Sequence, residues 1–93
     1  MPLYVLTYEY VPDVLEKRTP FRADHLANAR AWHAAGKLRF IGAFDPPSEG
    51  ALGVFEVASA AEVEEFVRAD PYVKNGIVVR HRVRPWGVAV GSV

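Results

Sequence analysis

The 93-residue sequence contains no cysteine. A chain without cysteine has no disulfide framework, no thiolate nucleophile and no cysteine ligands for a metal ion. It also lacks an excess of either charge, because eleven basic residues balance eleven acidic ones. Without a basic excess nothing points to nucleic acid, and no apolar run approaches the ~20 residues of a membrane span. We therefore expect neither a nucleic-acid partner nor a membrane partner.

The N-terminus lacks the charged and apolar regions of a signal peptide, because Met1-Pro2-Leu3 leads directly into a strand pattern. We therefore expect a cytoplasmic protein. Half of the residues are hydrophobic and a quarter are charged, as in a globular protein. A chain of this length predicts one domain, spanning residues 1–93, with a thin core.

Hydrophobic periodicity predicts four strands and two long helices. The strands are expected at Leu3–Tyr10, Lys37–Phe44, Ala51–Val57 and Ile77–Val83. The first helix follows a helical turn at Val14–Arg18 and runs from Pro20 to about Ala35; the second runs from a Ser59/Glu62 capping box to Ala69. This order predicts an α+β, ferredoxin-like βαββαβ fold, in which both helices cover one face of a four-stranded antiparallel sheet.

Both faces of the predicted sheet are apolar. On the first strand Val5 points one way and Leu6 the other, and on the second strand Leu38 and Phe40 oppose Ile41. A monomer with helices on one face should have a polar opposite face, and an exposed apolar sheet would be a larger patch than soluble monomers normally show. We therefore predict a homodimer in which two sheets pack face to face.

The last predicted strand carries arginines on alternate residues, among them Arg80 and Arg82. Charges of this kind protect an edge strand against aggregation. The same side chains could instead line a cavity that attracts an anion. The first interpretation is the commoner role, and the sequence leaves both open.

Asp70-Pro71-Tyr72 forms a corner between the second helix and the last strand. Pro71 disfavours helical geometry at Asp70, so the helix ends there. His25 lies on the face of the first helix that Ala29 shares, and we expect it to point toward the sheet. An imidazole with a reference pKa of ~6.5 can move protons near neutral pH, and a carboxylate beside it holds one tautomer. His25 and Asp70 are therefore candidate catalytic residues if they meet beside a cavity.

Each candidate also has a purely structural interpretation. A histidine on such a face is commonly a packing residue, and an aspartate before proline commonly accepts bonds from nearby backbone amides. We expect Asp70 to combine this cap with catalysis only if one carboxylate oxygen stays free. Tyr72 either buries its ring or steadies an oxyanion, and Arg22 either binds an anionic substrate group or pairs with a surface acid.

Five segments, in this order, resemble the YciI (YCII-related) family: Arg22-Ala23-Asp24-His25-Leu26, Gly36-Lys37-Leu38, Phe66-Val67-Arg68-Ala69-Asp70-Pro71-Tyr72, Gly76-Ile77-Val78 and Val83-Arg84-Pro85-Trp86. The resemblance covers nearly the whole chain. It implies a ferredoxin-like fold dimerised as an α+β barrel, with a cleft that contains an active-site histidine and aspartate. Those two residues correspond to His25 and Asp70. The Asp45–Gly50 loop is shorter than in many members, which leaves the substrate class open.

The resemblance also implies a reaction type. A related dehydrochlorinase acts on a chlorinated hydroxyhydroquinone, and muconolactone isomerase shares the barrel architecture. We therefore expect a cofactor-independent isomerase, lyase or dehydrochlorinase-like enzyme that acts on a small organic acid or a cyclic or aromatic compound. Its catalytic pair would be His25 and Asp70, with Arg22 and Tyr72 as substrate contacts.

Two other functions stay open. One is a non-catalytic, dimeric ligand-binding or accessory module, and the other is a haem or quinol monooxygenase of similar barrel shape. No cofactor is expected from the sequence, and no metal site either. His25 and His33 are eight residues apart, His81 belongs to another element, and no His-x-x-x-His pair exists.

Overall fold

The computed structural model describes residues 1–93, and it has the predicted order of strands and helices. The strands are β1 (Leu3–Tyr10), β2 (Leu38–Ala43), β3 (Ala51–Glu56) and β4 (Val78–Trp86). The helices are α1 (Val14–Lys17), α2 (Arg22–Ala34), α3 (Ala60–Ala69) and α4 (Pro71–Lys74), with short 3-10 turns η1 (Thr19–Phe21) and η2 (Pro47–Glu49). None of the helices is long and apolar enough to cross a membrane.

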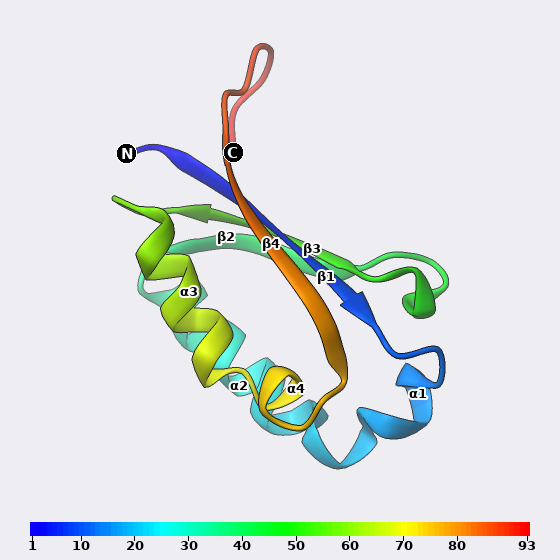
Figure 1. The fold of residues 1–93 in the computed structure, drawn as a ribbon. Helices are drawn as coiled ribbons and strands as arrows, with labels where there is room; N and C mark the ends of the chain where they lie inside the picture. Colours follow the sequence, from blue (N-terminus) through cyan, green and yellow to red (C-terminus); the bar gives the residue numbers. More distant parts are fainter.

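The four strands form one antiparallel sheet in the order β2-β3-β1-β4, which is the ferredoxin-like arrangement. Helices α2 and α3 lie on the same side of this sheet (Figure 1). The expected α+β fold is therefore confirmed. Strand β1 is central, and Tyr8 faces Ala51 of β3 on one side and His81 of β4 on the other. Gly50 is required beside it, because a Cβ on this residue would collide with the backbone oxygen of Tyr8.

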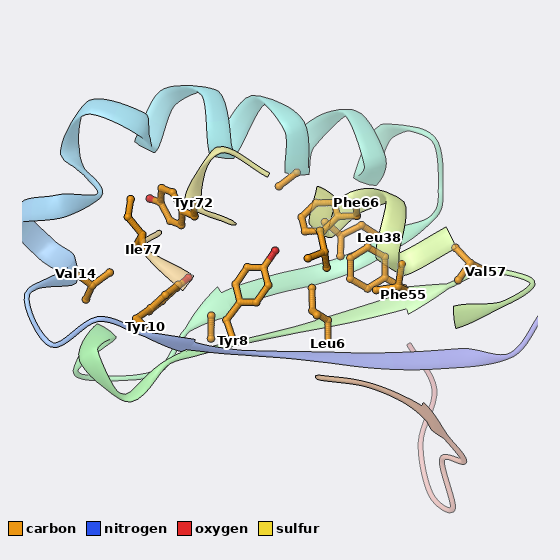
Figure 2. Close-up of a cluster of buried hydrophobic side chains, with 14 residues drawn as sticks. Leu6, Tyr8, Tyr10, Val14, Leu38, Phe55, Val57, Phe66, Tyr72 and Ile77 are labelled. Carbon is orange, nitrogen blue, oxygen red and sulfur yellow. The ribbon is translucent and has the colours of Figure 1, made fainter. Parts of the chain in front are cut away.

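The core lies between the helices and the sheet (Figure 2). Strand β1 contributes Leu6, Tyr8 and Tyr10 to it, because these alternate residues point to the helix-covered face. Below the helices the core is aliphatic and aromatic around Phe55 and Phe66, whose rings are 5.1 Å apart between centroids. Toward α4 it becomes rich in tyrosine, and this end holds the polar groups described below.

Two local predictions were wrong. Leu38 and Phe40 do not share a face, because β2 shifts register against β3 between them: Leu38 is buried in the core, whereas Phe40 is 54% exposed on the other side. The capping box of α3 is incomplete, since Ser59 makes no capping bond and Glu62 accepts a bond from the backbone nitrogen of Ala58 at 3.3 Å.

The sheet face away from the helices, here called the open face, is lined by apolar side chains and arginines. Val5, Leu52 and Trp86 border a hollow of about 420 Å³ there. Arg80 pairs with Glu9 at 3.4 Å across β1 and β4, and both side chains are largely exposed. Neither Arg80 nor Arg82 lines a cavity. Their position favours the edge-strand interpretation over the anion-binding one.

Candidate functional site

Asp70 is the centre of the site, and its carboxylate is fully buried. It accepts hydrogen bonds from three groups that belong to three different elements. His25 Nδ1 on α2 lies 2.8 Å from Oδ1, the Tyr72 backbone N–H on α4 donates to Oδ1 at 3.0 Å, and the Tyr8 hydroxyl on β1 donates to Oδ2 at 2.7 Å. Three donors compensate the loss of water around a buried carboxylate.

The backbone explains how Asp70 reaches this position. Its extended conformation, with φ −73° and ψ 120°, ends α3 and makes it the N-cap of α4, whose first residue is Pro71. From the sequence we expect Asp70 to combine capping with catalysis only if one carboxylate oxygen stays free, and neither oxygen is free. Oδ1 serves both the cap and His25, because one oxygen has two lone pairs, while Oδ2 is occupied by Tyr8.

This bonding pattern assigns the tautomer of His25. An ionised carboxylate only accepts hydrogen bonds, so the Nδ1 atom that faces it carries the hydrogen, and Nε2 of the neutral ring has a free lone pair. Nε2 accepts no hydrogen bond from the protein. The side-chain nitrogen and oxygen atoms that are both buried and without a partner are Asn28 Nδ2 and the Tyr72 hydroxyl, so Nε2 is not among the buried atoms. Nε2 is therefore accessible, and His25 lines a cavity.

Tyr8 is a hydrogen-bond partner of Asp70 that sequence reasoning missed. It is separated from Asp70 by 62 residues, and the only signal for it was the inward position of the residue on β1. Burial, and then the negative charge of Asp70, raise the pKa of Tyr8 far above the ordinary value for tyrosine. The hydroxyl thus stays protonated and continues to donate to Asp70. Figure 2 shows this side chain rising from β1 toward the helices.

Tyr72 fixes the plane of the imidazole. Its ring stacks on that of His25, with 3.8 Å between centroids and 5° between planes, while Tyr10 contacts it edge-on at 6.1 Å. The Tyr72 hydroxyl is buried and has no hydrogen-bond partner. The carboxylate fixes one end of the imidazole and the stack fixes its plane, so the direction of Nε2 is set before any ligand binds.

The cavity beside Nε2 has a volume of about 290 Å³. It contains His25, Arg22 and Tyr72 of the predicted site, together with ten residues from the surrounding elements: Tyr10, Arg18, Leu26, Ile41, Gly42, Ala43, Phe44, Asp45, Pro47 and Ala51. Sequence reasoning did not find Arg18 or Tyr10. The short 45–50 loop still borders the cavity, through Asp45 and Pro47.

The other two histidines lie elsewhere. His33 Nδ1 is 2.8 Å from the carbonyl oxygen of Leu38, and His81 Nε2 is 2.7 Å from a carboxylate oxygen of Glu64. No group of three histidine, aspartate or glutamate side chains is placed to hold a metal ion. Among the histidines, only His25 combines a carboxylate partner on one nitrogen with a cavity on the other.

Comparison with known proteins gives a consistent picture. Residues 2–87 match the YCII-related domain. Protein YciI of Escherichia coli O6:H1 is 33% identical over 93 residues, which cover 90% of this chain and 95% of the relative. An uncharacterized protein of Haemophilus influenzae is 29% identical over 92 residues, covering 89% of this chain and 94% of the relative.

One solved structure is also similar. It is 5-chloro-2-hydroxyhydroquinone dehydrochlorinase (TftG) from Burkholderia phenoliruptrix in complex with 2,5-dihydroxybenzoquinone. The TM-score is 0.78 at 27% sequence identity, and the match covers 91% of this chain and 93% of that one. At this level of identity and coverage, the fold and the position of its elements are shared along almost the entire chain.

Proposed function

The chain belongs to the YCII-related family, and on that premise we propose that it is a small enzyme that moves a proton on its substrate without a cofactor. His25 acts as the general base or acid and Asp70 orients it. The observation that carries this proposal is the 2.8 Å contact of Asp70 with Nδ1 while Nε2 stays free beside a cavity. The similarity to a dehydrochlorinase supports an enzyme-like role.

The chemistry follows from the two nitrogens of the ring. Nε2 takes a proton from a carbon of the substrate, and its electron pair forms the new N–H bond. The imidazolium that results keeps its Nδ1–H bond to Asp70, whose charge stabilises the new positive charge. The electrons left on carbon either expel a leaving group, which is elimination, or accept the proton again at another carbon, which is isomerisation.

The substrate is a small organic acid or a cyclic or aromatic compound. A cavity of about 290 Å³ lies at the lower limit of the ~300–1,000 Å³ that is common for drug-sized ligands. Tyr72 and Arg22 line it and are the proposed substrate contacts. The dehydrochlorinase, which by its name acts on 5-chloro-2-hydroxyhydroquinone, is a precedent for a one-ring substrate in this fold.

The competing hypothesis is a ligand-binding or accessory module without turnover. One observation favours it: Asp70 would be fully hydrogen-bonded by His25, Tyr8 and Tyr72 even if no reaction took place. Under this hypothesis the cavity binds a small molecule and His25 only stabilises the fold. The two hypotheses differ in whether bound ligand exchanges a carbon-bound hydrogen.

The test is a screen of small lactones, hydroxyquinones and halogenated acids in D₂O, with NMR detection of C–H to C–D exchange or product. The wild type should turn over at least one compound. His25→Asn, which can still donate to Asp70 but cannot take a proton, should lower the rate by about 10²- to 10⁴-fold. His33→Ala, outside the cavity, is the matched control and should keep the rate.

Three results would contradict the proposal. Equal rates in wild type and His25→Asn would remove His25 from the chemistry. Binding of a compound by the wild type without any exchange would favour the ligand-binding module. A shift and sharpening of the Soret band of added haemin, relative to haemin alone, would favour a haem protein instead.

We also propose that two copies pack through their open faces to form a homodimer. The support is the apolar character of this face, where Val5, Leu52 and Trp86 line one hollow and Trp86 is 46% exposed. Burial of apolar surface contributes roughly 25 cal/mol per Å². A chain of 93 residues has a small core, so such an interface adds appreciably to its stability.

A further inference from the structure

Two arginines at the His25 cavity have no partner in the protein. Arg18 and Arg22 stand on either side of η1, and both line the cavity. Neither guanidinium has a carboxylate within 4.0 Å, whereas the neighbouring Lys17 pairs with Asp13 at that distance. Arg18 is half-buried and Arg22 is exposed. The site thus presents two cations whose hydrogen-bond donors are free for a ligand.

Positive and negative charges lie at different ends of the cavity. Asp45 is the only acidic residue in the cavity wall, and it pairs with neither arginine. Asp70 lies behind the imidazole, where it is fully buried and already accepts three hydrogen bonds. An anionic ligand is therefore attracted to the arginine end and kept away from the carboxylate end.

The positive charges of Arg18 and Arg22 both act on the phenol of Tyr10. Burial raises the pKa of Tyr10, with further contributions from Tyr72 and Asp70, and the positive charges of Arg18 and Arg22 oppose this rise. Tyr10 and both arginines line the same cavity. The arginine charges thus act on the interior of the cavity and not only on solvent at its mouth.

The rest of the wall suits an apolar body. Leu26, Ile41 and Phe44 line the cavity together with the stacked ring of Tyr72. A bare inorganic anion would leave this apolar wall unused, whereas a compound with a hydrocarbon body and one acid group fits both parts. The volume of about 290 Å³ limits that body to about one ring or a short chain.

We propose that Arg18 and Arg22 together bind the carboxylate of a small organic acid, and that this acid is the substrate class of the site. The apolar body then lies between the arginines and the imidazole, which places a carbon of the ligand at His25 Nε2. Guanidinium groups form two parallel hydrogen bonds to a carboxylate, which fixes the orientation of the bound acid. This inference rests on the function proposed above, because it names the substrate class of the same site.

Benzoate is the probe, with benzamide as its neutral counterpart and inorganic phosphate as an anion without an apolar body. Binding is measured by calorimetry and by NMR shifts of the Tyr72 and His25 resonances. The wild type should bind benzoate at least tenfold more tightly than either control ligand. Arg18→Gln and Arg22→Gln should each weaken benzoate binding by about ten- to a hundredfold, the range for hydrogen bonds to charged groups. Arg68→Gln, which removes an exposed and unpaired arginine of α3, should change nothing.

The same titration separates this inference from the catalytic one. His25→Asn should keep benzoate binding within about threefold while it loses turnover, so acid binding is tested even if no reaction is found. Phosphate bound more tightly than benzoate would overturn the inference, and so would equal affinity for benzoate and benzamide. Benzoate binding that survives in the Arg18→Gln/Arg22→Gln double variant would also overturn it.

Discussion

Two pairs of an acidic and a basic side chain lie on opposite faces of the sheet at strand β1, and they differ in burial, distance and bonding. On the helix-covered face, Tyr8 leads to Asp70 and His25, a pair 2.8 Å apart whose side chains are 0% and 8% exposed. On the open face, Glu9 meets Arg80 at 3.4 Å, with side chains 61% and 77% exposed. Adjacent residues of one strand thus lead to a buried network and to a solvated ion pair.

The difference shows why only one of these pairs is a candidate for chemistry. A buried carboxylate must have all of its acceptors satisfied, and the donors that satisfy Asp70 also hold His25 in one orientation. The exposed side chains of Glu9 and Arg80 can bond to water as well as to each other, so this pair does not hold a neighbouring side chain in one orientation. The open face offers apolar area instead, which suits association with a second chain. The predictions below test this division from the largest expected effect to the smallest.

Asp70→Leu should have the largest effect on stability. It leaves the Tyr8 hydroxyl, the Tyr72 N–H and His25 Nδ1 without their buried acceptor. We expect a loss of about 3–5 kcal/mol in the free energy of unfolding, measured by urea denaturation. Glu9→Leu is the control from the other face and should change stability by about 0.5 kcal/mol or less. Equal losses in the two variants would contradict the proposed division.

Leu52→Glu should affect association and leave the helix-covered face intact. Leu52 lines the hollow of the open face, and a charge there would be buried by a face-to-face dimer. We expect the dimer dissociation constant to rise by about 30-fold or more, measured by light scattering across a dilution series. Leu52→Met keeps the apolar contact and should dimerise like the wild type. A wild type that is monomeric at all concentrations would refute the proposed dimer.

Tyr8→Phe should weaken the protein and change its response to alkali. At pH 8 we expect a loss of about 1–2 kcal/mol from the missing bond to Asp70. In the wild type, the raised pKa of folded Tyr8 stabilises the protein below the ordinary tyrosine value of ~10, and this stabilisation is lost as the pH rises beyond it.

The alkaline decline should therefore be shallower in Tyr8→Phe, by about 1.4 kcal/mol per pH unit above pH ~10. Urea unfolding curves between pH 8 and pH 11 measure it, and Tyr4→Phe on the same strand is the control. If the free energy of unfolding fell equally with pH in wild type and Tyr8→Phe, the pKa of Tyr8 would be the same in the folded and unfolded states, which would contradict this prediction.

Arg80→Gln should have the smallest effect. The pair with Glu9 is solvated on both sides, and such pairs contribute about 0–1 kcal/mol. We expect a change of about 0.5 kcal/mol or less in the free energy of unfolding, and less still in high salt. A loss comparable to that of Tyr8→Phe would mean that the open face is less solvated than the isolated chain shows.

The primary structure was sufficient for the order of elements and for two of the site residues. Strand and helix periods are local properties, so alternation and the 3.6-residue repeat placed His25 on the inward face of α2, where it is found. Pro71 disfavours helical geometry in the residue before it, so the end of α3 and the non-helical conformation of Asp70 were predictable. The family resemblance added that these two residues form a pair.

Only the tertiary structure decided the rest. Tyr8 reaches Asp70 across 62 residues because the pairing of β1 between β3 and β4 sets its position, and no local pattern encodes that register. The register shift in β2 turned Phe40 outward against the simple alternation. Likewise, Arg18 joins Arg22 at one cavity only after η1 folds the chain between them. Steric constraints between neighbouring residues can be predicted from the local sequence. The hydrogen bonds of Tyr8 and His25 to the buried Asp70 carboxylate depend instead on how distant elements pack together.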